Sequence, residues 1–287
     1  MKKILKKATC MLLALVSTIA SVGMFTACET KNPEVKMQIE FDGETYTLEY
    51  KLYREFAPAT VKHFLMLAEN GYFNGVCVHN FDEENSKMYT GAYTYDANAE
   101  NGGIVYKNYY DIVASYEDFN HTVWVNSDKT DPTYTLKGEF SANRVKVDSG
   151  SFLEQSFGSL TMQYTEKDFD ELEDVAVLRA QKSDNGEYET NSREYKYNSA
   201  TSQFSIYTST MNKADSAHCT FATLMDKSVS VLEDLLAAIS AQEGDFVNVY
   251  EVDVDRDDAL IAEYENTAEY SVPVTPIVIT SVKVTKY

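Results

Sequence analysis

The sequence has 287 residues, with 25 lysines and arginines against 45 aspartates and glutamates, and a formal net charge of −20. A chain this acidic repels the phosphates of nucleic acid and an anionic lipid surface, which argues against proteins that bind nucleic acid or lie flat on such a membrane. Apolar residues make up 44% of the chain and aromatic residues 13%, so it can bury a core and does not have the composition of a disordered protein.

The first residues follow the pattern of a bacterial export signal. Lysines precede an apolar run from Met11 to Ala20, and small residues then lead to the segment Phe25-Thr26-Ala27-Cys28. A small residue directly before a cysteine at this point resembles the lipobox of bacterial lipoproteins, in which leucine is usual at the position that Phe25 takes here. We therefore predict that residues 1–27 are a lipoprotein signal peptide and that Cys28 carries the lipid.

The same segment predicts where the rest of the chain lies. Residues 28–35 are polar and would form a short tether on the extracytoplasmic face of a bacterial membrane. A multiply acylated cysteine is a stable anchor, whereas a single acyl chain binds only marginally. The alternative is an uncleaved membrane span over residues 8–27, which also leaves the rest of the chain outside because the lysines lie on the cytoplasmic side.

The first predicted elements after the tether are two strands, a helix and a third strand. Lys36 to Phe41 and Thr45 to Tyr53 alternate polar and apolar residues around Asp42-Gly43, as in a β-hairpin. Apolar residues then recur with a helical period over residues 58–70. Val76 to His79 follows as a short strand.

The middle of the chain predicts an irregular stretch, short strands and one more helix. Residues 92–135 are rich in tyrosine, with a strand candidate at His121 to Asn126. Leu136 to Phe140 and Gly158 to Tyr164 have strand composition. Acidic residues from Asp168 onward, basic residues further along and a stop at Asp184-Asn185-Gly186 suit a helix aligned with its own dipole.

The last third of the chain predicts strands around one amphipathic helix. Phe204 to Tyr207 and Cys219 to Met225 are strand candidates, and residues 228–240 place leucines and an isoleucine on one helical face. Ile277 to Val284 is rich in β-branched residues and closes the chain as a strand. The order of elements predicts one antiparallel, mainly β domain with two or three helices.

Metal and cofactor motifs are weak or missing in this sequence. Asp253, Asp255 and Asp257 suggest a calcium loop, but Asp258 and Tyr264 stand where an EF-hand needs glycine and glutamate. These aspartates therefore indicate a solvated acidic turn, with a weaker calcium site as the alternative.

The histidines and cysteines also give no metal site. The histidines lack zinc-ligand spacing with one another or with a cysteine, and no phosphate-binding or dinucleotide-binding motif is found. We expect no metal and no cofactor. Cys77 and Cys219 are more typical of small buried apolar residues than of a disulfide pair.

Several segments, taken in order, resemble the cyclophilin-type peptidyl-prolyl cis-trans isomerases of bacteria. They are Tyr53–Val61, Gly71–Gly75, Val78-His79, Leu136–Phe140, Gly158–Met162, Asn198–Phe204, His218–Phe221 and Pro276–Val282. The resemblance implies a closed eight-stranded antiparallel β-barrel with two capping helices over residues 36–287. Relative to the family, the chain has two insertions, near 92–135 and 165–197.

The resemblance also implies which residues line the site. Members of the family use the histidine of the third strand, here His79, and the arginine directly after it, where this chain has Asn80. Met88 and Thr90 stand for a methionine and a glutamine of the pocket, and either Lys87 or Arg144 could supply the missing cation.

The other half of the implied site is a mixture of retained and changed positions. Gln203 and His218 match the family and would act in catalysis, while Phe204 matches a substrate-binding phenylalanine. Ser205 replaces the second phenylalanine, which forms the pocket floor, and the pair Gln163-Tyr164 replaces alanine and asparagine.

The implied reaction is rotation about the amide bond before a proline, whose barrier is about 18–20 kcal/mol. It needs no nucleophile, base or metal, only a pocket for the proline and donors that weaken the amide resonance. The first hypothesis is a weak or altered isomerase that acts on proline-containing exported polypeptides. The second is a non-catalytic, membrane-anchored module that binds peptides or proteins. A solute-binding lipoprotein is a third and weaker reading, because that class has two α/β lobes.

Overall fold

A computed structural model describes residues 31–143, 145, 152–163, 174–194, 200–211, 218–253 and 267–287, and the structural statements below concern these residues. Cys28 and the predicted signal peptide lie outside them. Within the described part of the chain, no helix combines the length and the apolar character that a membrane span requires.

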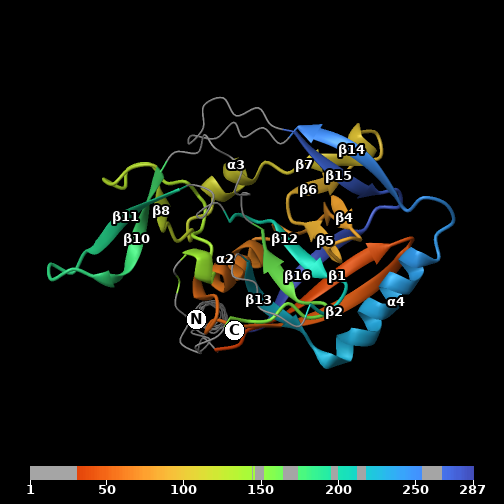
Figure 1. Cartoon of the computed structure of the whole chain (residues 1–287), viewed down its shortest axis with the longest axis horizontal. Coiled ribbons are helices and arrows are strands. Elements are labelled where there is room, and N and C mark those ends of the chain that lie inside the picture. The colour runs from red at the N-terminus through yellow and green to blue at the C-terminus, as the bar shows by residue number, and fades with distance from the viewer. Residues whose placement is uncertain are drawn as a thin grey trace, which may run out of the picture. The chain divides into compact units, whose positions relative to one another are not determined.

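The main feature of the fold is a large antiparallel sheet (Figure 1). The described residues contribute eleven strands to it, in the order β4-β5-β12-β9-β13-β2-β1-β16-β3-β6-β7. In chain order these strands are β1 Glu34–Phe41, β2 Glu44–Leu52, β3 Val76–Cys77, β4 Asn80–Asp82, β5 Lys87–Thr90, β6 Tyr93–Tyr95, β7 Ile104–Tyr106, β9 Leu160–Met162, β12 Phe204–Tyr207, β13 Cys219–Leu224 and β16 Val278–Lys286.

The sheet is strongly curled into a half-barrel. Strands β3 and β4 are separated in the chain only by Val78 and His79, yet they stand far apart in the strand order. The sheet must therefore bend until these two positions come together. The fold is mainly β, as predicted, but ladder pairing does not show the closed eight-stranded barrel.

The first hairpin follows directly from its sequence. Asp42 and Gly43 have φ angles of 49° and 80°, the left-handed conformation that a tight hairpin turn requires. Alternate residues of β1, among them Val35, Met37 and Ile39, are buried, and the residues between them are not. The predicted strand pair is confirmed.

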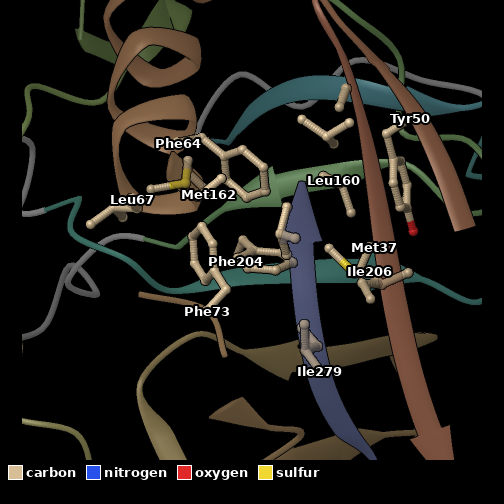
Figure 2. Close-up of a cluster of buried hydrophobic side chains, with 14 of the residues drawn as sticks. Met37, Tyr50, Phe64, Leu67, Phe73, Leu160, Met162, Phe204, Ile206 and Ile279 are labelled. Carbon is tan, nitrogen blue, oxygen red and sulfur yellow. The ribbon is translucent and has the colours of Figure 1, made fainter. Parts of the chain in front are cut away.

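The inner face of the sheet carries the core (Figure 2). Helix α2 (Pro58–Glu69) places Phe64 against the rings of Phe73 and Phe204, with centroids 4.8 and 5.5 Å away. Helix α4 (Val229–Ser240) buries Leu232, Leu235 and Ile239 and packs on β2. Both predicted helices are confirmed.

Helix α2 is capped by a buried carboxylate from a distant segment. Its N-cap residue Ala57 has no side chain for the purpose, and Glu139 instead accepts the backbone N–H groups of Ala59 and Thr60, at 3.1 and 2.8 Å. The segment Leu136–Phe140, predicted as a strand, forms only an isolated bridge between Leu136 and Ala200. Its role is to hold the helix, not to extend the sheet.

Glu139→Ala should lower the free energy of unfolding by about 1–3 kcal/mol, because it leaves buried N–H groups of α2 without an acceptor. Denaturant unfolding would measure this, with exposed Glu69→Ala at the other end of the helix as the control. Burial raises the pKa of Glu139, so the neutral Glu139→Gln should be tolerated better than alanine. Equal stability of the two alanine variants would contradict the capping role.

The helix predicted from Asp168 is wrong in the part that the structure describes. Asp174–Lys182 is strand β10, which pairs with β11 (Tyr188–Glu194) and with the short β8 (Val123–Trp124). β-Branched valines favour a strand in β10, and Gly186, with φ 84°, turns the hairpin that had been read as a helix stop. Within residues 92–135, the short helix α3 (Tyr109–Ala114) follows β7.

A further antiparallel pair of strands was not predicted. Strands β14 (Val247–Asp253) and β15 (Thr267–Pro273) pair along their whole length. Their Val252 and Val272 join Cys77, Ala92, Tyr93 and Ile104 in a second, small core. Asp255 and Asp257 lie outside the described residues, and within those residues no cluster of acidic, histidine or cysteine side chains suits a metal ion. Cys77 and Cys219 are free, buried thiols.

Candidate functional site

The candidate site lies on the outer face of one end of the curled sheet. Asn80, Tyr89, Ser205, Thr161 and Thr220 are direct cross-strand partners on β4, β5, β12, β9 and β13. Directly paired residues of neighbouring strands point to the same face. These five residues therefore form one continuous line across the sheet, which we call the polar row.

The opposite face of the same strands is the apolar core. Phe81, Met88, Phe204 and Ile206 alternate with residues of the polar row and are buried in the main core cluster. Thr90 is also buried, and its hydroxyl donates to the carbonyl of Cys77 at 2.9 Å.

Three residues that the family resemblance assigned to the site thus lie on the core face of the sheet, opposite the polar row. The side chains of Met88, Thr90 and Phe204 point into the core. Successive residues of β5 and β12 point to opposite faces, so the neighbours of these three residues occupy the outer face. Lys87 and Tyr89 take the outward positions on β5. On β5 the resemblance gave the correct strand with a register shifted by one residue.

A second line of polar residues lies beside the polar row. Gln163 donates through its side-chain nitrogen to the Ser205 hydroxyl at 3.1 Å, and its backbone N–H donates to the Gln203 carbonyl at 3.0 Å. Continuing the β9–β13 register brings His218 next to Gln163. The structure places Gln203, Gln163 and Ser205 together, and the strand register places His218 beside them, while Tyr164 lies outside the described residues.

The centre of the polar row is shielded from solvent. Ser205 and Thr161 are fully buried and Thr220 nearly so, and the hydroxyls of the two threonines lie 3.0 Å apart. Satisfied hydroxyls replace the aromatic floor that a proline pocket would need. The arrangement offers hydrogen-bonding partners at this point and little apolar surface.

One end of the polar row is in contact with the β14–β15 pair. The side-chain oxygen of Asn80 accepts the backbone N–H of Ser271 at 3.0 Å. The ring of the adjacent His79 lies between those of Tyr93 and Tyr270, at centroid distances of 4.8 and 5.1 Å. Burial lowers the pKa of His79 to about 3, so this histidine is neutral and serves in packing.

One cation stands on the outer face near the row. The Lys87 ammonium lies 5.3 Å from the ring centre of Tyr207 and 5.9 Å from that of Tyr89, both within the range of cation–π attraction. Lys87 pairs with Asp82 across β4 and β5, two residues along from the pair Tyr89 and Asn80. It is a positively charged side chain one step away from the position of the absent arginine.

Comparisons with known proteins identify one family. A family model described as cyclophilin type peptidyl-prolyl cis-trans isomerase/CLD matches residues 35–256. Among solved structures, the chain is similar to a cyclophilin type peptidyl-prolyl cis-trans isomerase of Cryptosporidium parvum, with 13% identity, a TM-score of 0.43 and coverage of 89% of this chain and 99% of that chain. It is also similar to the Mimivirus cyclophilin, with 17% identity, a TM-score of 0.43 and coverage of 90% and 91%. A search of curated proteins found no match.

Proposed function

The chain belongs to the cyclophilin-type peptidyl-prolyl cis-trans isomerase family, and we propose that it is a slow or altered isomerase that acts on proline-containing exported polypeptides. The observation that carries this proposal is the grouping of Gln203, Gln163 and His218 beside Ser205 on one face of the sheet. These side chains can hold a peptide carbonyl and an amide by hydrogen bonds while the bond before proline turns.

Two features of the site make slow turnover the expected behaviour. Removing one preorganised donor that stabilises a transition state typically costs about 10²–10³ in rate, and Asn80 offers its oxygen to Ser271 where the family has an arginine. Ser205 also provides no apolar wall for the proline ring. Lys87 places a positive charge on this face.

The proposed location follows from the first residues of the sequence. Lipidation of Cys28 would hold the domain on the extracytoplasmic face of a bacterial membrane, where exported chains emerge unfolded. The whole chain has a net charge of −20, and removal of residues 1–27, which carry lysines and no acidic residue, would leave a still more acidic domain that stays away from anionic lipid. Metabolic labelling with a palmitate analogue tests this point, and loss of the label in Cys28→Ala is the expected result. A wild-type chain that takes up no label would contradict it.

A protease-coupled assay with an Ala-Pro-containing peptide tests the isomerase. We expect Gln203→Ala to lower kcat/KM at least tenfold, because it removes a side chain that borders Ser205 and Gln163. The matched control is Gln38→Ala, which changes a partly buried glutamine on β1, away from the site. No acceleration by folded wild-type protein over the uncatalysed rate would reject the proposal.

A non-catalytic peptide-binding module is the second candidate, and one observation favours it. Asn80 is held against β15 through its side-chain oxygen, and what remains for a substrate is a neutral amide N–H where the family has a charged donor. In that case the wild-type protein would bind proline peptides, measured by fluorescence anisotropy, without accelerating their isomerisation.

A further inference from the structure

The β14–β15 hairpin touches the candidate site at adjacent residues. The N–H of Ser271 donates to the Asn80 side chain, and the ring of the preceding residue, Tyr270, packs on His79. Figure 1 shows β14 and β15 beside β4, β6 and β7. The contact is part of a packed surface, because valines of the hairpin join side chains of β3, β6 and β7 in the second core.

The hairpin fits closely against the sheet. Gly102, with φ 73°, lies under it, and a Cβ at this position would meet the Tyr250 ring at 2.8 Å and the Val272 side chain at 3.0 Å. Contacts this short with ring and methyl carbons leave no room for a larger residue. The sequence thus has a glycine at a position where a side chain would collide with the hairpin.

The residue at position 80 suits this contact. Asparagine has a side-chain carbonyl that accepts the Ser271 N–H, whereas arginine has donors only and could not accept it. The change that removes the family's arginine therefore also creates a binding point for β15. Asn80 acts here as a positioning residue for the hairpin.

We propose that Ser271 and Tyr270 are specificity-determining residues, which hold the β14–β15 hairpin over the Asn80 end of the polar row. Peptides that need this end for binding must first break the Asn80–Ser271 contact, and those that bind along Gln203, Gln163 and His218 need not. The inference rests on the proposed function, since it concerns which peptides the same site admits.

Ser271→Pro is a selective test of this contact. Ser271 pairs with Val249, but its N–H points away from β14 toward Asn80, so proline deletes the contact and no hydrogen bond between β14 and β15. Pro273 already stands two residues further along the same strand. Glu269→Pro, two residues in the other direction, is the matched control, and Tyr270→Ala is a second variant that loosens the hairpin at His79.

The measured quantity is the affinity of a fluorescent Ala-Pro-containing peptide, by anisotropy, for the full chain and its variants. Because the contact contributes about one hydrogen bond, we expect Ser271→Pro and Tyr270→Ala to bind roughly threefold to tenfold more tightly than wild type, and Glu269→Pro to bind like wild type. Wild-type binding that neither variant improves would overturn this inference alone. Failure of every protein to bind the peptide would overturn the proposed function together with it.

Discussion

The Asn80→Arg variant should turn over a proline-containing peptide about 10²-fold faster than the Asn80→Ala variant. Both substitutions remove the oxygen that accepts the Ser271 N–H, so both break the hydrogen bond between β15 and the Asn80 end of the site. Only arginine adds a charged donor, and one preorganised donor aimed at the turning amide is worth about 10²–10³ in rate. The alanine variant therefore separates the effect of the donor from the effect of the hairpin.

The protease-coupled assay measures this ratio. Hydrogen exchange of the β15 amides checks that the hydrogen bond from Ser271 is lost in both variants. Faster exchange at Ser271 with equal turnover in the two variants would mean that the substrate does not reach position 80. Such a result would favour the non-catalytic module over a damaged isomerase. Unchanged exchange in both variants would contradict the hydrogen bond as the holding contact.

Local patterns predicted the elements whose neighbours agree with them. The Asp42-Gly43 turn and the alternation of β1 and β2 describe a hairpin in any context, and α2 and α4 carry apolar stripes that the core uses. The turn at Asn185-Gly186 shows the limit, because the same dipeptide ends a helix or turns a hairpin. Valines in β10 that pair with β11 decide between the two, and pairing is a tertiary property.

The candidate site was predicted in its strands and only partly in its side chains. A motif match that is one residue out of register turns every side chain of a strand to the other face. That is why Met88 and Thr90 are in the core, while Lys87 and Tyr89 line the outer face. The turn between β4 and β5 sets this register.

The contact that most changes the interpretation of the site joins two residues, Asn80 and Ser271, that are far apart in the sequence. Nothing in the residues around Asn80 indicates that Ser271 donates to it. The alternation of Thr267–Pro273, with Val272 and Pro273 buried at its end, was the available signal for β15. The aspartates from Asp253 onward instead predicted an acidic turn or a weak calcium site.

Phe204→Ala should lower the free energy of unfolding by about 3–5 kcal/mol, the largest effect on stability that we expect at a residue assigned to the site from the sequence. The Phe204 ring is fully buried, with the rings of Phe64 and Phe73 at 5.5 and 5.6 Å. Figure 2 shows these three rings together between α2 and the sheet. Alanine would leave a cavity between α2 and the sheet, which the surrounding structure can fill only in part.

Denaturant unfolding measures the loss, with Val249→Ala as the control, since Val249 is 63% exposed and its truncation should change stability by only about 0.5 kcal/mol or less. Peptide affinity, measured without denaturant at a temperature where both variants are folded, distinguishes a core role from a binding role. A core role predicts a large fall in stability with affinity close to that of wild type. A small fall in stability with strongly weakened binding would place Phe204 at the substrate, as the family motif implied. Because Ser205 next to it points to the other face, only one of these neighbours can line the site, and the alternation of β12 assigns that position to the serine.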